Sequence, residues 1–196
     1  MKCKQAQSGL ALSSVLVLMS LLAWVALSSW RQVVTHAFLL NAQADHLRAQ
    51  QQAQATLMWA KQLIQEKTNP QLPNHLQAWS QFRQQLPWDG CRNGFCAFGN
   101  DNLSPGLSFW KTQTQHARAL PAEFSIHGDN KAWYWIEVLP DAQRVKAQAA
   151  DPFVYRITVL AQGVKPASLV VQQAMWQSDA DPLNTGRWLS WKTLLE

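Results

Sequence analysis

Residues 10–30 read LALSSVLVLMSLLAWVALSSW, a stretch of 21 residues whose only polar members are five serines. As an α-helix this stretch is about 31 Å long, because each residue adds about 1.5 Å, and that length matches the hydrocarbon core of a bilayer. Lys2 and Lys4 precede it, with no acidic residue beside them. Trp30 and Arg31 follow it, where an interfacial anchor belongs. This charge pattern predicts a cytoplasmic N-terminus and a chain that continues across the membrane.

Three interpretations of this segment are open. A cleaved secretory signal would be cut after Ser28, but the apolar stretch exceeds the usual length of about 7 to 15 residues. A plain single-pass anchor requires nothing further from the sequence. In the third interpretation the basic leader MKCKQAQSG, residues 1–9, is removed after Gly9 and the apolar helix stays uncleaved, which is similar to the type III signal of prepilins. The N-terminus of the mature protein distinguishes the three.

The helical pattern continues beyond the apolar stretch. No Gly or Pro interrupts residues 10–69, and Asn69-Pro70 predicts the end of the helix. Apolar residues recur at steps of four and three along one seam, which we expect to pack on a domain. We expect the Gln side chains of the Gln- and Ala-rich stretch 50–55 to lie mainly on a solvated face. The members of the seam are Val33, Ala37, Leu40, Ala44 and Leu47, with Met58 and Ile64 close to it. The sequence thus predicts one long helix, transmembrane over 10–30 and amphipathic over 31–69.

A tight cysteine loop lies in the remaining region, residues 70–196. Cys91 and Cys96 enclose four residues, and the central Asn93-Gly94 is a strong turn signal that folds the chain back on itself. Outside the cytoplasm we expect these two cysteines to form a disulfide. A zinc site would need two more ligands at regular spacing, which the scattered histidines do not offer. Cys3 lies in the leader, on the cytoplasmic side, and has no partner there.

The region after the cysteine loop predicts an antiparallel sheet. Residues 123–127 and 132–138 flank the turn cluster Gly128-Asp129-Asn130 and suggest one hairpin. Residues 153–161 and 168–176 flank a turn at 163–166 and suggest a second. Residues 187–191 form a further short apolar run, either an edge strand or a packed tail. Before the loop, Trp79, Phe82, Leu86 and Trp88 suggest a short helix. A long helix followed by strands predicts an α+β fold with a globular domain over 70–196.

With these motifs the chain resembles the minor pilins of type IV pili, and among them the PilX type. The resemblance rests on the leader that ends at Gly9, on the Cys-x4-Cys loop and on two C-terminal segments. The first of these is Tyr155-Arg156-Ile157-Thr158, followed by Gly163 and Leu169-Val170-Val171-Gln172, and the second is Gly186-Arg187-Trp188-Leu189-Ser190-Trp191.

The resemblance implies a pilin-like fold, in which a membrane and spine helix packs on an antiparallel sheet. It also implies that prepilin peptidase cuts after Gly9 and that the new N-terminal residue, Leu10, is methylated. The protein would then leave the inner membrane, where its C-terminal domain is periplasmic. It would join other minor pilins and a pilus-tip adhesin in a complex that starts assembly and sits at the tip.

One position departs from the pilin pattern. Most pilins carry Glu at the fifth mature position, where it can neutralise the N-terminal amine of a neighbouring subunit. Counting from Leu10, this chain has Ser14 there. A charge in hydrocarbon costs several kcal/mol unless it is paired, so a neutral residue suggests fewer neighbours or a special place in the filament.

Composition argues against catalysis and nucleic-acid binding. Hydrophobic residues make up 47% of the chain and charged residues 15%, so the chain can fill a core and is not a disordered tail. The 17 basic residues exceed the 12 acidic ones, but no run of five basic residues occurs. The five histidines have no partner spacing, and no phosphate loop or nucleophile elbow is present. Asp151, Asp179, Asp181 and Asn184 fit no calcium loop. We therefore expect no enzyme, no cofactor, no metal and no nucleic-acid partner.

Overall fold

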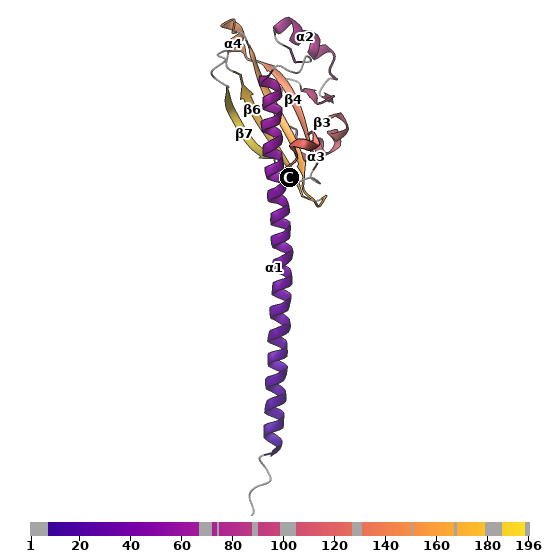
Figure 1. The fold of residues 1–196 in the computed structure, drawn as a ribbon, viewed down its shortest axis with the longest axis vertical. Helices are drawn as coiled ribbons and strands as arrows, with labels where there is room; N and C mark the ends of the chain where they lie inside the picture. Colours follow the sequence, from indigo (N-terminus) through magenta and orange to yellow (C-terminus); the bar gives the residue numbers. More distant parts are fainter. Residues whose placement is uncertain are drawn as a thin grey trace, which may run out of the picture. The chain divides into compact units, whose positions relative to one another are not determined.

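The computed structural model describes residues 8–66, 72–73, 75–87, 90–98, 105–126, 131–149, 151–166, 168–178 and 186–194. The chain divides into two units, Met1–Ala44 and Asp45–Glu196, which are described separately. The helices are α1 (Ser8–Gln65), α2 (Leu76–Gln84), α3 (Leu107–Thr112) and α4 (Ala142–Lys146), with 3-10 helices η1 (Gln113–His116) and η2 (Ala122–Phe124). The strands are β1 (Gly90–Arg92), β2 (Phe95–Ala97), β3 (Arg118–Ala119), β4 (Ala132–Pro140), β5 (Phe153–Gln162), β6 (Leu169–Gln177) and β7 (Arg187–Leu194). The predicted α+β fold class is confirmed (Figure 1).

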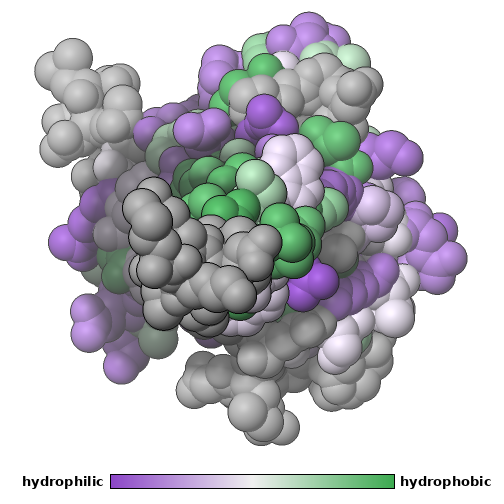
Figure 2. Space-filling view, turned by 90° about the horizontal axis from the view of Figure 1, so that it is seen from below, coloured by the Kyte–Doolittle hydropathy of each residue, from purple (hydrophilic) through white to green (hydrophobic). Residues whose placement is uncertain are grey.

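The first unit consists of the N-terminal part of α1. This helix is long and apolar enough to cross a membrane, and none of the residues in its most apolar stretch is buried. The hydroxyls of Ser20 and Ser28 donate to backbone carbonyls three or four residues earlier, at Val17, Trp24 and Val25, so these polar groups are satisfied within the helix. Hydrophobic side chains, coloured green, gather near the centre of the view from below (Figure 2). A surface of this kind suits lipid or other apolar helices around it.

In the second unit, α1 packs on the sheet through small side chains. Ala49, Ala53 and Ala60 are fully buried there, together with Leu57, while Ile64 is almost fully buried. These residues share one core cluster with the inner face of the strands. Because alanine has no side chain beyond Cβ, it lets a helix backbone approach a sheet closely. We call this contact surface of α1, formed by Ala49, Ala53 and Ala60, the alanine face.

Within the second unit, the predicted seam was wrong for Leu47 and Met58 and right for Ile64. Leu47 is 56% exposed and Met58 is 44% exposed. The Gln-rich stretch also differs from expectation, because Gln52 is fully buried and its Oε1 accepts the N–H of Ile126 at 2.9 Å. The predicted stop at Asn69-Pro70 lies outside the described residues, and α1 ends at Gln65.

The sheet has the strand order β1-β2-β4-β5-β6-β7, and β3 pairs with β4 beside β2. The hairpin of β5 and β6 confirms the prediction for 153–161 and 168–176. Of the two alternatives for 187–191, the structure shows the strand, since β7 pairs with β6 from Val171 to Gln177. The sheet is not purely antiparallel, because β2 runs parallel to β4.

The predicted hairpin of 123–127 with 132–138 was wrong. Residues 122–124 form a 3-10 helix, and β4 instead pairs with β5 on one side and with β2 and β3 on the other. The Phe124 ring stacks on Trp59 at a centroid distance of 3.9 Å, so this aromatic residue is used for packing rather than for a strand. His127 and the turn 128–130 lie outside the described residues.

A second core cluster lies on the face of the sheet opposite α1. Trp110 of α3 packs against Trp135 at a centroid distance of 4.9 Å, above Leu160 and Val171. Cys91 and Cys96 belong to the same cluster. The sheet therefore has α1 on one face, and α3 with the side chains of Cys91 and Cys96 on the other.

Candidate functional site

The cysteine hairpin is the first feature that sequence reasoning singled out. Asn93 and Gly94 have φ values of 51° and 77°, the positive values that a two-residue type I′ hairpin turn requires. Cys91 and Cys96 are opposite each other in the register and are joined by a disulfide, with a Cα–Cα distance of 4.1 Å. By the chain-entropy estimate, closing so short a loop stabilises the fold by about 2 kcal/mol.

Hydrogen bonds tie this hairpin to the rest of the domain. The Gly94 N–H donates to the His116 carbonyl at 2.7 Å, and the Ile136 N–H donates to the Gly94 carbonyl at 2.8 Å. Arg118 Nε donates to the Asn93 carbonyl at 3.1 Å, and its guanidinium lies 4.9 Å from the centre of the Phe95 ring. The hairpin therefore holds a defined position beside β4.

A buried carboxylate joins α1 to the turn between β5 and β6. Asp45 is 3% exposed and accepts the N–H of Val164 at 2.8 Å and that of Lys165 at 3.0 Å. A hydrogen bond from the Ser168 side chain lowers the pKa of Asp45, burial opposes this, and the two backbone N–H groups and Arg48 lower it further. A Cβ on Gly163 would lie 2.8 Å from this carboxyl, so glycine is needed for the close approach. We call this set of contacts the Asp45 clamp.

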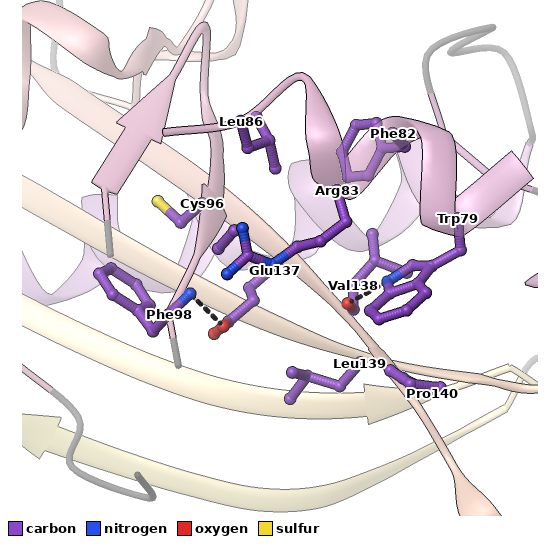
Figure 3. A pocket seen from close by; sticks show the side chains of 11 residues that line it. Trp79, Phe82, Arg83, Leu86, Cys96, Phe98, Glu137, Val138, Leu139 and Pro140 are labelled. Carbon is purple, nitrogen blue, oxygen red and sulfur yellow. Dashed lines mark hydrogen bonds between the residues drawn. The ribbon is translucent and has the colours of Figure 1, made fainter. Parts of the chain in front are cut away.

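A second buried carboxylate lies beneath a small pocket (Figure 3). Glu137 Oε1 accepts the N–H of Phe98 at 3.1 Å, and its Oε2 pairs with Arg156 at 3.0 Å. Burial raises the pKa of Glu137, against the influence of Arg156, of the Phe98 N–H and of Arg83. Trp79 Nε1 donates to the Val138 carbonyl at 2.9 Å and so closes the end of the β4 edge that β2 leaves uncovered.

This pocket has a volume of about 260 Å³, below the roughly 300 to 1,000 Å³ of typical small-molecule sites. Its walls are mainly apolar and come from α2, β2 and β4. The carboxylate of Glu137, beneath the pocket, pairs with Arg156 and accepts the backbone N–H of Phe98. The pocket is thus a packing defect beside an ion pair rather than an assembled acid–base site.

The other candidate polar residues have local roles. His75 Nδ1 accepts the Ala78 N–H at the start of α2, and His46 hydrogen-bonds to Gln50. Asp151 accepts the N–H of Phe153 at 3.2 Å. Among the residues that the structure describes, no three His, Cys, Asp or Glu side chains gather as metal ligands. His36 and His116 belong to different helices, whereas His127, Asp179, Asp181 and Asn184 lie outside the described ranges.

Comparison with known proteins gives one match. Residues 92–178 match the family described as type IV pilus assembly protein PilX C-term. Over these 87 residues the chain is similar to the C-terminal part of that family. No curated protein and no solved structure matches the chain.

The matched segment includes part of the structural features just described. It begins in the cysteine hairpin, contains the Glu137–Arg156 pair and ends directly after β6. It also contains the turn that Asp45 holds, although Asp45 itself lies outside it. This similarity relates residues 92–178 to proteins of type IV pilus assembly.

The predicted processing residues lie outside the matched segment. Gly9 and Leu10 lie in the first turns of α1, and Ser14 is exposed one turn further along. The structure does not test cleavage after Gly9 or methylation of Leu10, so these stay predictions.

Sequence reasoning missed the two buried carboxylates. Asp45 could have been singled out from the sequence, because it is the first acidic residue after 44 residues without any. Glu137 and Arg156 also carry one, since each is a charged residue in the middle of a strand that is otherwise almost wholly apolar. That the two would be directly opposite each other depended on the register of β4 and β5, which the sequence did not reveal.

Proposed function

We propose that this protein is a minor pilin that helps initiate type IV pilus assembly, at or near the pilus tip and in a complex with other minor pilins. The similarity of residues 92–178 carries the proposal, since it relates the chain to pilus assembly. The exposed apolar part of α1 supports it, because such a helix suits both a bilayer and a bundle of apolar helices.

The proposed life cycle has two stages. The precursor crosses the inner membrane once, with residues 1–9 in the cytoplasm and the C-terminal domain in the periplasm. Prepilin peptidase then cuts after Gly9 and Leu10 is methylated, and the subunit joins other minor pilins and a tip adhesin. Removal of the leader eliminates Lys2 and Lys4, whose charges are costly inside an apolar bundle.

Two alternatives predict different N-termini. A single-pass anchored interaction protein unrelated to pili would keep Met1, and a secreted soluble protein would begin at Ser29. The intact mass of the protein from envelope fractions distinguishes both from a chain that begins at methylated Leu10. A mature protein that begins at Met1 or Ser29 would refute the minor pilin.

A variant tests the processing step directly. Gly9→Val should leave a precursor that is heavier by the nine-residue leader and should abolish piliation. Ser13→Val, inside the mature helix, is the matched control and should mature normally. Normal maturation of Gly9→Val would show that the leader is not a prepilin signal.

A further inference from the structure

The strand β7 (Arg187–Leu194) forms an open edge of the sheet. It pairs with β6 on one side, and within the described residues no strand pairs with its other side. Six of its eight residues are exposed, including Leu189 at 43% and Trp191 at 41%. An edge strand presents a row of backbone N–H and C=O groups that can pair with another chain.

The opposite edge of the sheet is built differently. Its last strand, β1, has only three residues and is one strand of the disulfide hairpin. Short edge strands, proline, bulges, inward charges and charged side chains on the edge, especially lysine, are the usual devices that limit pairing. The register shift of the β6–β7 pair lies at Leu189, opposite Met175 and Trp176, and the regular part that follows, Ser190–Leu194, contains no proline and one charged residue, Lys192. The regular part of β7 is therefore about as long as an average strand, and its outer backbone groups are available for pairing.

The two faces of β7 differ in chemistry. Trp191 is opposite Ala174, which belongs to the cluster packed on α1, so Trp191 lies on the α1 face of the sheet. Lys192 is opposite Gln173 and lies on the other face. Both side chains are exposed. A strand added beside β7 would thus meet an aromatic ring on one face and an ammonium group on the other.

We propose that the β7 edge binds an extended segment of another protein by strand addition, and that this segment alternates apolar with acidic side chains. The backbone of the segment completes the ladder, which supplies affinity, while alternate side chains supply specificity. An apolar side chain beside Trp191 and a carboxylate beside Lys192 are favourable cross-strand pairs. The argument does not depend on the pilin proposal, because it rests on the edge and its charges.

A second copy of this chain is a poorer occupant. The described part of β7 carries Arg187 and Lys192 but no acidic residue. Pairing β7 with the β7 of another copy would add four cations along one ladder with no acid to offset them, and like charges on neighbouring strands destabilise a sheet. Charge complementarity therefore selects an acidic partner strand.

The test uses the full chain in detergent micelles and two synthetic peptides about as long as β7. The first peptide alternates valine and glutamate, and the second alternates valine and lysine. The glutamate peptide should slow amide hydrogen exchange in β7 and leave the exchange of β1 unchanged. The lysine peptide should bind roughly fivefold more weakly or not at all.

Charge-reversal variants link this preference to one residue. Lys192→Glu should reverse it, so that the lysine peptide becomes the better ligand. Lys146→Glu, on the exposed end of α4, makes the same change of net charge away from the edge and should keep the original preference. Both side chains are exposed, so both variants should keep the thermal transition of the parent protein.

Three results would overturn the proposal. The first is equal protection by both peptides, or none by the glutamate peptide. The second is protection that appears outside β6 and β7. The third is a stable dimer of the free chain in which β7 amides are already protected, as sedimentation and exchange measured together would reveal.

Discussion

At the scale of single residues, Asp45 of the second unit is a carboxylate held by the Ser168 side chain and by two backbone N–H groups. It is buried, yet its surroundings lower its pKa, because a hydroxyl and two backbone N–H groups stabilise the ionised form more than burial destabilises it. The carboxylate therefore contributes to folding as an anion. The negative charge also fixes the turn that joins β5 to β6.

The Asp45 clamp predicts a pH dependence. Because the folded pKa lies below the ordinary value of 3.8, the stabilisation is fully present above that value and is lost as the pH falls through the folded pKa. Asp45→Asn should lower the unfolding free energy by about 2 kcal/mol at neutral pH. The difference between variant and parent should shrink below about pH 3.8. Thermal unfolding across a pH series measures it, and a difference that is independent of pH would contradict the clamp.

Gly94 is the second residue at which the structure predicts the effect of a substitution. Its φ is +77°, and a Cβ there would lie 2.5 Å from Cγ of Arg118. Gly94→Ala should therefore destabilise the domain by about 1 to 2 kcal/mol. Gly106→Ala is the matched control, since a Cβ there has no neighbour within 4 Å. Denaturation midpoints compare the two, and equal midpoints would show that the hairpin adapts.

At the scale of elements, the sequence predicted the strands better than it predicted their contacts. The runs that became β4, β5 and β6 were recognised because β-branched and aromatic residues end at clear turn signals. The partner of β4 was misassigned, because pairing depends on long-range packing such as the contact of Phe124 with Trp59. The buried face of α1 was misread because large apolar residues define a seam in sequence, whereas close packing selects Ala49 and Ala53.

The alanine face gives a prediction for α1. Ala53 has no exposed surface, so Ala53→Leu would overpack the contact with the sheet and should cost about 1 to 3 kcal/mol. Gln54→Leu, the next residue, is exposed and should change stability by less than about 0.5 kcal/mol. Circular dichroism melts of the full chain in detergent measure both. Tolerance of leucine at both positions would show that α1 does not pack closely there.

At the scale of the whole molecule, Ser14 bears on the proposed place of the subunit. If a neutral residue reflects a position at the head of the filament, deletion of the protein should sharply lower the number of pili while the remaining ones keep their length and diameter. Ser14→Glu would place a carboxylate in hydrocarbon, at a cost of about 2 to 3 kcal/mol if unpaired, and should be neutral or harmful. Electron microscopy and subunit counting measure these effects. Copy numbers like those of a shaft subunit, or better incorporation of Ser14→Glu, would argue for a shaft position.

The Asp45 clamp also has a mechanical consequence. A tensile load carried along α1 from its apolar end reaches Asp45 before the alanine face. There one carboxylate accepts two backbone N–H groups, so we expect both bonds to share the load instead of rupturing in succession. Such a junction resists shear better than a row of bonds that unzips singly. Optical-tweezer pulling on the Asp45→Asn variant should show a lower rupture force than pulling on the parent chain. Equal rupture forces would show that contacts other than those of Asp45 resist the load.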